Sequence, residues 1–163
     1  MRRPIFTVLL SLAALLLASA SEGASFPAVR GGGGAVASAE EASTEVGLEI
    51  LRAGGNAVDA AVATALALAV VHPQAGNLGG GGFAVVRMND QLMSLDFREV
   101  APAAATRDMY LDDEGRPWKD ASSIGPLAAG VPGSPIGLYE LHQRFGALPW
   151  PRILRPARQL ASE

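Results

Sequence analysis

Residues 47–71 read GLEILRAGGNAVDAAVATALALAVV, and this stretch predicts two consecutive helices. The first helix should run to about Arg52, where the glycine pair that follows ends it. Asn56 is well placed to cap the second helix, and Asp59 suits the first turn because the helix dipole favours a negative charge there. Residues 57–71 are apolar on almost every face, which is typical of a buried helix.

The segment before this stretch carries signals for a helix start and a short strand. Ser38 and Glu41 have the spacing of a capping box, in which each side chain bonds to the other residue's free amide. Residues 35–38 form a short apolar strand candidate. Residues 21–34 end in four glycines and are interpreted as a flexible lead-in to the folded part.

The first 20 residues have the layout of a secretory signal peptide. Two arginines follow Met1, an apolar stretch covers residues 5–18, and Ala18-Ser19-Ala20 forms a cleavage site of small residues. An uncleaved anchor is the weaker alternative, since a spanning helix needs about 20 apolar residues. We expect residues 1–20 to be removed and the protein to be exported, to the periplasm or beyond the cell, with no membrane attachment afterwards.

Composition excludes several classes of function. Loss of the signal peptide removes two of the 13 basic residues and leaves 11 against 16 acidic residues, a net charge of −5. Without a basic patch, nucleic acid is not an expected partner. The chain has no cysteine, which excludes disulfides and thiolate metal sites. Neither His72 nor His142 has neighbours at metal-ligand spacing, so no metal is expected.

Four consecutive glycines at residues 79–82 are the next marked feature. Together with Ala84 they formally fit a dinucleotide-binding pattern. That pattern requires a strand before the glycines and a helix after them, and here the predicted order is reversed. We therefore reject a nucleotide site, expect no cofactor, and interpret the glycines as a close backbone crossing.

Residues 83–88 and 91–97 predict two strands, joined by a tight turn at Asn89-Asp90. Alternation along the second strand separates two faces, with Met93, Leu95 and Phe97 on one and Ser94, Asp96 and Arg98 on the other.

The remainder predicts an irregular region and two further helices. Residues 100–130 are irregular, with short helical pieces near 106–111. Ser134 and the proline after it have the order of an N-cap and a first helical residue, and Gly146 ends that helix. Pro149 begins a last helix.

Two features of this last helix concern its course and its end. Pro156 should bend it. Its pattern is still running at Glu163, with neither a glycine stop nor a polar tail, so we interpret the sequence as an interrupted chain.

Arg98 has the least settled role among the charged residues. It lies at the exit of a strand, next to Glu99 and two residues from Asp96. A structural ion pair with a neighbouring carboxylate is the simpler explanation. A planar guanidinium at a strand end can also hold a small carboxylate by two parallel hydrogen bonds. The residues alone leave both roles open.

From residue 35 onward, about 130 residues carry a set of motifs in the order found in the γ-glutamyltransferase (γ-glutamyltranspeptidase) family, which the sequence resembles. The motifs are GLEILRAGGNAVDAA at 47–61, GGGGF at 79–83, LDFRE at 95–99, APAAA at 101–105, GVPG at 130–133, YELHQRFG at 139–146 and LPW at 148–150.

The resemblance implies an α+β fold, a partial αββα sandwich of the N-terminal-nucleophile hydrolase type. Residues 35–163 would be the truncated N-terminal part of the large subunit. In the family, a precursor cleaves itself, and the new N-terminal threonine of the small subunit attacks the γ-glutamyl amide of glutathione or a related compound. The acyl group then passes to water or to an acceptor amino acid or peptide. The nucleophile is expected beyond Glu163, so this chain would hold no catalytic residue.

One ligand contact carries over by resemblance. Arg98 matches the arginine that holds the α-carboxylate of the donor, and Glu99 and Asp96 would support and orient it. The small subunit of the same precursor is the expected partner. Alone, the chain should be inactive and poorly folded. Alternatives are a cephalosporin acylase-like or γ-polyglutamate-processing relative and, outside the enzymes, a non-catalytic remnant or a secreted binding module.

Overall fold

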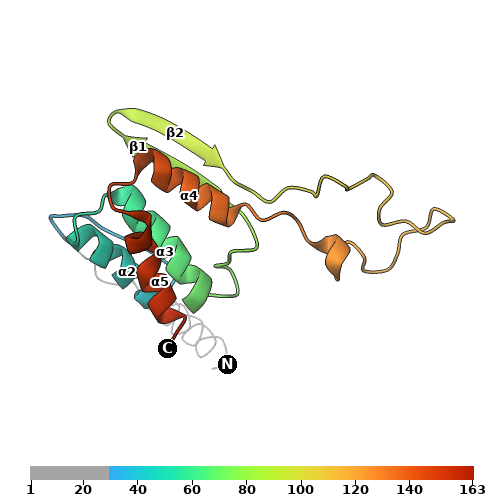
Figure 1. Ribbon diagram of the computed structural model, residues 1–163, viewed down its shortest axis with the longest axis horizontal. Coiled ribbons are helices and arrows are strands. Elements are labelled where there is room, and N and C mark those ends of the chain that lie inside the picture. Colours follow the sequence, from blue (N-terminus) through green and yellow to red (C-terminus); the bar gives the residue numbers. More distant parts are fainter. Residues whose placement is uncertain (1–29) are drawn as a thin grey trace, which may run out of the picture. The chain divides into compact units, whose positions relative to one another are not determined.

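The computed structural model describes residues 30–163. The expected signal peptide and most of the lead-in lie outside these residues. The rest of the lead-in, residues 30–34, is exposed and contains neither helix nor strand. Residues 33–163 form one compact unit in which helices pack beside a two-stranded sheet (Figure 1). The expected mixture of helices and strands is confirmed.

The two helices predicted from the opening stretch are present as α2 (Glu41–Arg52) and α3 (Ala57–Val71). The cap of α3 is the predicted one. The side-chain oxygen of Asn56 accepts from the backbone N–H groups of Val58 and Asp59 at 2.9 and 3.0 Å, and the Asp59 carboxylate accepts from the Asn56 N–H at 3.0 Å. Because α3 is apolar nearly all round, it packs against α2 and against two later helices, α4 (Ser134–Phe145) and α5 (Trp150–Leu160), and lies at the centre of the core.

The start of α2 differs from the prediction. Its N-cap is Glu40, and no side chain caps it. The hydroxyl of Ser38 instead donates to the Glu40 carbonyl at 2.9 Å and lies 2.7 Å from the hydroxyls of Ser43 and Thr44. The prediction of a capping box between Ser38 and Glu41 was therefore wrong. Residues 35–38 are not a strand either, since no neighbouring strand pairs with them in the described part of the chain.

The predicted hairpin is present as β1 (Phe83–Met88) and β2 (Gln91–Asp96), paired antiparallel with Phe83 opposite Asp96. Asn89 and Asp90 form the turn with φ of 49° and 61°, as a two-residue turn matched to strand twist requires. β2 ends one residue earlier than expected, although the Phe97 N–H still donates to the Gly82 carbonyl at 2.9 Å.

Two helices follow, α4 (Ser134–Phe145) and α5 (Trp150–Leu160). Gly146 ends α4 as predicted, but the N-cap is Gly133 and Ser134 is already helical. The predicted serine cap was wrong: Ser134 is the first helical residue, and its N–H, which has no partner inside the helix, donates to the Gly80 carbonyl at 2.9 Å.

The last helix starts after Pro149 as expected and contains Pro156. It does not run on to Glu163. Its C-cap is Ala161, so the expectation of a helix still open at the last residue was wrong. The bend at Pro156 stays a prediction.

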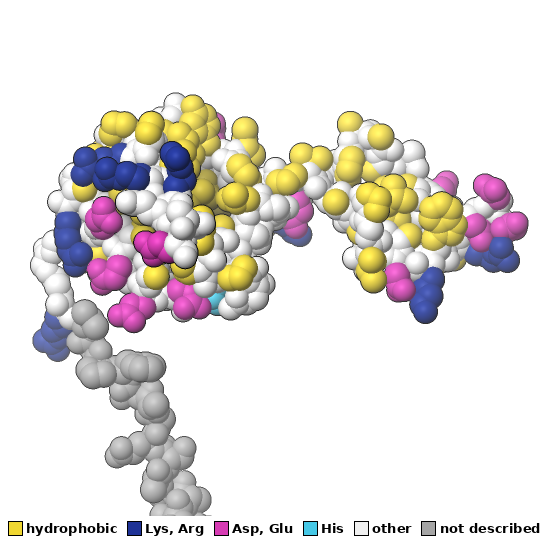
Figure 2. Space-filling model, turned by 60° about the horizontal axis from the view of Figure 1, so that its bottom comes forward, with side chains coloured by type: hydrophobic (Ala, Val, Ile, Leu, Met, Phe, Trp, Pro, Cys, Tyr) yellow, Lys and Arg dark blue, Asp and Glu magenta, His cyan; other side chains and the backbone are white. Residues whose placement is uncertain are grey.

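Between the hairpin and α4 the chain makes a long excursion, closed at its base by an antiparallel bridge between Val100 and Val131. The expected helical pieces near residues 106–111 are absent: residues 107–110 form turns and Leu111 pairs with Pro117 in an isolated bridge. The one helical segment described in the excursion is the short 3-10 turn η1 (Pro126–Ala128). Many apolar side chains of the excursion are exposed (Figure 2). Trp118 is 54% and Ile124 is 72% exposed.

Candidate functional site

Three chain segments converge where β2 ends: the glycine run, the residues after β2, and the start of α4. The ring of Phe97 lies against Gly137 of α4, where a side chain on the glycine would overlap it. The carbonyl of Gly80 accepts from the N–H groups of Gly133 and Ser134 at 2.8 and 2.9 Å. The backbone just before the excursion is therefore fixed from two sides.

The predicted close backbone crossing is confirmed at the centre of the glycine run. A Cβ added to Gly81 would lie 2.5 Å from the Cα of Arg98 and 2.6 Å from the N of Glu99. Contacts that short require the backbone to move. Gly79 differs, since it faces open space. The run is thus one close crossing flanked by looser positions.

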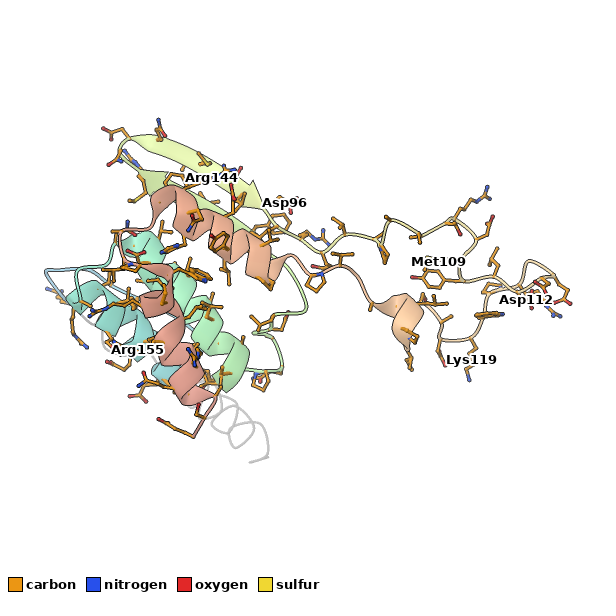
Figure 3. The ribbon with its side chains drawn as sticks, viewed as in Figure 1. Asp96, Met109, Asp112, Lys119, Arg144 and Arg155 are labelled. Atoms are coloured by element: carbon orange, nitrogen blue, oxygen red, sulfur yellow. The ribbon has the colours of Figure 1, made fainter. Side chains whose placement is uncertain are left out.

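Arg98 projects from this fixed backbone into solvent. Its N–H donates to the Asp96 carboxylate at 3.0 Å, at the end of β2 (Figure 3). Its guanidinium carbon lies 5.8 Å from the ring centroid of Phe83, within cation–π range. In residues 30–163 the guanidinium forms no ion pair, and neither Asp96 nor Glu99 reaches it. The ion pair between Arg98 and a neighbouring carboxylate is therefore not formed. Asp96 instead accepts a hydrogen bond from the backbone N–H of Arg98.

Comparison with known proteins places this arrangement in a family. The model of the Gamma-glutamyltranspeptidase family matches residues 43–163. This chain belongs to that family. The glutathione hydrolase proenzyme of Pseudomonas aeruginosa is 51% identical over 155 residues, which is 95% of this chain and 27% of that protein.

Solved structures of γ-glutamyltranspeptidases have the same arrangement of elements. The enzyme from Pseudomonas nitroreducens, complexed with L-DON, is 52% identical with a TM-score of 0.73, over 78% of this chain and 38% of that one. The Helicobacter pylori enzyme is 44% identical with a TM-score of 0.78, over 83% of this chain and 39% of that one. This chain spans about three tenths of the length of these curated relatives.

The carboxylate of Asp59 is fully buried and joins two parts of the chain through hydrogen bonds. Asp59 has no exposed surface, and besides capping α3 it accepts from the N–H groups of Ala147 and Leu148 at 3.0 and 3.3 Å. His142, on α4, lies 2.7 Å from the Leu148 carbonyl and 3.8 Å from Asp59. Sequence reasoning missed this junction because its partners lie 88 and 89 residues from Asp59.

The other histidine is also held by protein groups. His72, the C-cap of α3, lies 2.7 Å from a carboxylate oxygen of Glu40 and 3.0 Å from the amide of Gln74. In the part of the chain that the structure describes, no three His, Asp or Glu residues are grouped to hold a metal ion. Among the same residues, no helix has the length and apolar character needed to cross a membrane.

Proposed function

We propose that this chain is the N-terminal part of the large subunit of an exported γ-glutamyltransferase, which takes γ-glutamyl groups from glutathione and related donors. Family membership supports the class of reaction. The observation that carries the role of this chain is Arg98, a guanidinium without an ion pair among the described residues, on a fixed backbone.

The chemistry of a guanidinium fits one part of such a donor. Its planar fork can give two parallel hydrogen bonds to a carboxylate, and charge-assisted hydrogen bonds are worth about 1.5–3 kcal/mol each. The γ-glutamyl group carries one free carboxylate, the α-carboxylate. Arg98 would hold it and so fix where the scissile amide lies relative to the nucleophile.

The bond-making step would use residues beyond this chain. The hydroxyl of a threonine, freed as the N-terminus of the small subunit, attacks the γ-carbonyl carbon, and its α-amine takes the proton. The amide bond breaks and its nitrogen leaves as the amine. The acyl-enzyme is then cleaved by water or by the amine of an acceptor amino acid or peptide.

The hairpin offers a surface for the rest of such an enzyme. On its outer face Phe83 is 68%, Val85 74% and Leu92 74% exposed. An exposed apolar sheet face is typical of one that packs against another layer. We propose that further strands of the same precursor cover it and complete an αββα sandwich, with the small subunit as partner.

The test uses a chimera in which this chain replaces the matching N-terminal part of the P. aeruginosa proenzyme. We expect it to hydrolyse γ-glutamyl p-nitroanilide, and we expect the 163-residue chain alone to be inactive. Arg98→Lys should raise KM for this donor about 100-fold, because lysine cannot reproduce the fork.

Arg107→Lys is the matched control, since Arg107 is another exposed arginine and lies outside the hairpin face that we propose to be covered. It should leave KM unchanged. Equal effects of the two substitutions, or no effect of Arg98→Lys, would remove Arg98 from the donor site.

A further inference from the structure

We propose that Gly81 and Gly133 are positioning residues for Arg98, which set where its guanidinium meets the donor carboxylate. The inference rests on the proposed role of Arg98 and extends it to residues that touch no substrate. It gives Gly81, inside the glycine run, a part in donor recognition because its backbone packs directly against the backbone of residues 97–99.

The first contact lies under Arg98 itself. The Cα of Gly81 lies so close to residues 97–99 that an added Cβ would come within 2.5 Å of the Phe97 carbonyl oxygen and of the Arg98 Cα. Both are backbone atoms, so no side-chain rotation can relieve the overlap. Any side chain at Gly81 must therefore displace the backbone that carries Arg98.

The second contact comes from the start of α4. A Cβ on Gly133 would overlap the Phe97 carbonyl oxygen and lie 2.8 Å from the Arg98 carbonyl oxygen. The N–H of Gly133 donates to the Gly80 carbonyl at 2.8 Å, which ties α4 to the glycine run. Residues 97 and 98 are thus clamped between two glycines from different parts of the chain.

Backbone hydrogen bonds also hold residues 97–100 in place. The N–H of Phe97 is held by Gly82, that of Arg98 by Asp96, and Val100 exchanges two bonds with Val131 at 3.2 and 2.8 Å. Arg98 is exposed, yet its backbone has little freedom. A displacement of the backbone must therefore move the guanidinium, and a misplacement of about 1 Å can cost a site about 100-fold in rate.

The experiment compares two donors in the chimera: γ-glutamyl p-nitroanilide and 4-aminobutanoyl p-nitroanilide, which lacks the α-carboxylate. The readout is the ratio of their kcat/KM values. Gly81→Ala should lower this ratio about 100-fold, mainly through KM for the first donor. A merely structural defect would reduce the rates for both donors together and leave the ratio unchanged. Gly79→Ala is the matched control, since a methyl group there meets open space.

Asp96→Ala keeps the test decisive if Gly81→Ala fails to fold. It removes the acceptor for the Arg98 N–H without adding an atom, so it loosens the same backbone without any steric overlap. We expect a folded enzyme with a smaller fall in the ratio. A normal ratio in folded Gly81→Ala, or in Asp96→Ala where the first variant does not fold, would overturn the inference.

Arg98→Lys, measured in parallel, separates this inference from the proposed function. If Arg98→Lys lowers the ratio and the glycine variants do not, Arg98 binds the carboxylate without help from the glycines. If Arg98→Lys also leaves the ratio unchanged, the donor role of Arg98 is wrong and the positioning role is wrong with it.

Discussion

Asp59 and Arg98 both lie in motifs shared with γ-glutamyltranspeptidases, but their surroundings are opposite. Asp59 is fully buried, and backbone N–H groups from two parts of the chain satisfy its carboxylate. Arg98 is exposed, and in the described residues its guanidinium forms no ion pair, whereas its backbone is held on several sides.

The contrast distinguishes two uses of a charged residue. A charge whose partners all come from its own chain joins elements together, because burying it requires those partners. A charge on a rigid backbone without an ion pair is free to meet a partner from outside, which is the role that the proposed function gives to Arg98. The predictions below test each side of this contrast.

The largest effect is expected at the buried charge. Asp59→Ala removes the acceptor for the N–H groups of Asn56, Ala147 and Leu148 and leaves them buried. We expect the free energy of unfolding of the chimera to fall by about 4 kcal/mol, measured by urea titration. Asp113→Ala is the control, since Asp113 is exposed and its φ is not in the left-handed region, and it should change the stability little. A loss no larger than that control would contradict the joining role of Asp59.

A smaller effect is expected at the backbone support of Arg98. Asp96→Ala removes the acceptor for the Arg98 N–H. We expect KM for γ-glutamyl p-nitroanilide to rise about tenfold, the equivalent of one hydrogen bond. Asp96→Asn retains a side-chain carbonyl and should recover most of the affinity. Equal KM values for the alanine and asparagine variants would show that this bond does not position Arg98.

The smallest effect is expected at Asp112, a partly buried charge whose partners are close in sequence. On the excursion, the Arg116 N–H, the largest cause, lowers the pKa of Asp112 below its ordinary value of 3.8, and the Arg116 side chain adds to this (Figure 3). Arg116→Ala keeps the N–H, so the pKa should rise only part of the way back. NMR titration of a carboxyl-labelled sample measures this.

The sign of the associated stability effect follows from the direction of the shift. A carboxyl group whose pKa is lowered on folding stabilises the fold above its unfolded pKa, and this is lost as pH falls through the folded value. The contribution of Asp112 is therefore complete above pH 3.8 and lost only in stronger acid. A pKa of Asp112 unaffected by Arg116→Ala would exclude the side-chain contribution.

Features encoded by neighbouring residues could be predicted from the sequence. The cap of α3 needs only Asn56 and Asp59, and the hairpin turn needs only Asn89 and Asp90. The ends of these elements are set within a few residues, so local chemistry decides them.

Features that depend on residues far apart in the sequence could not be predicted from it. Ser134 has the chemistry of a cap, but the helix begins with Ser134 itself, and the N–H groups of Gly133 and Ser134 both donate to the distant Gly80 carbonyl. Residues 35–38 have the composition of a strand, yet a strand forms only where another one pairs with it. At the candidate site, resemblance gave Arg98 a role, whereas the clamp around it depends on residues 80–82 and 133–137, which only the fold brings together.

The bridge between Val100 and Val131 holds the two ends of the excursion next to each other. Residues 101–130 can therefore become longer or shorter while residues 97–100 keep their hydrogen bonds and backbone contacts. Each doubling of a flexible loop costs only about 0.6 kcal/mol in closure entropy. This excursion is therefore a suitable place to insert a tag or a reporter domain, and lengthening it would leave Arg98 where the glycines hold it.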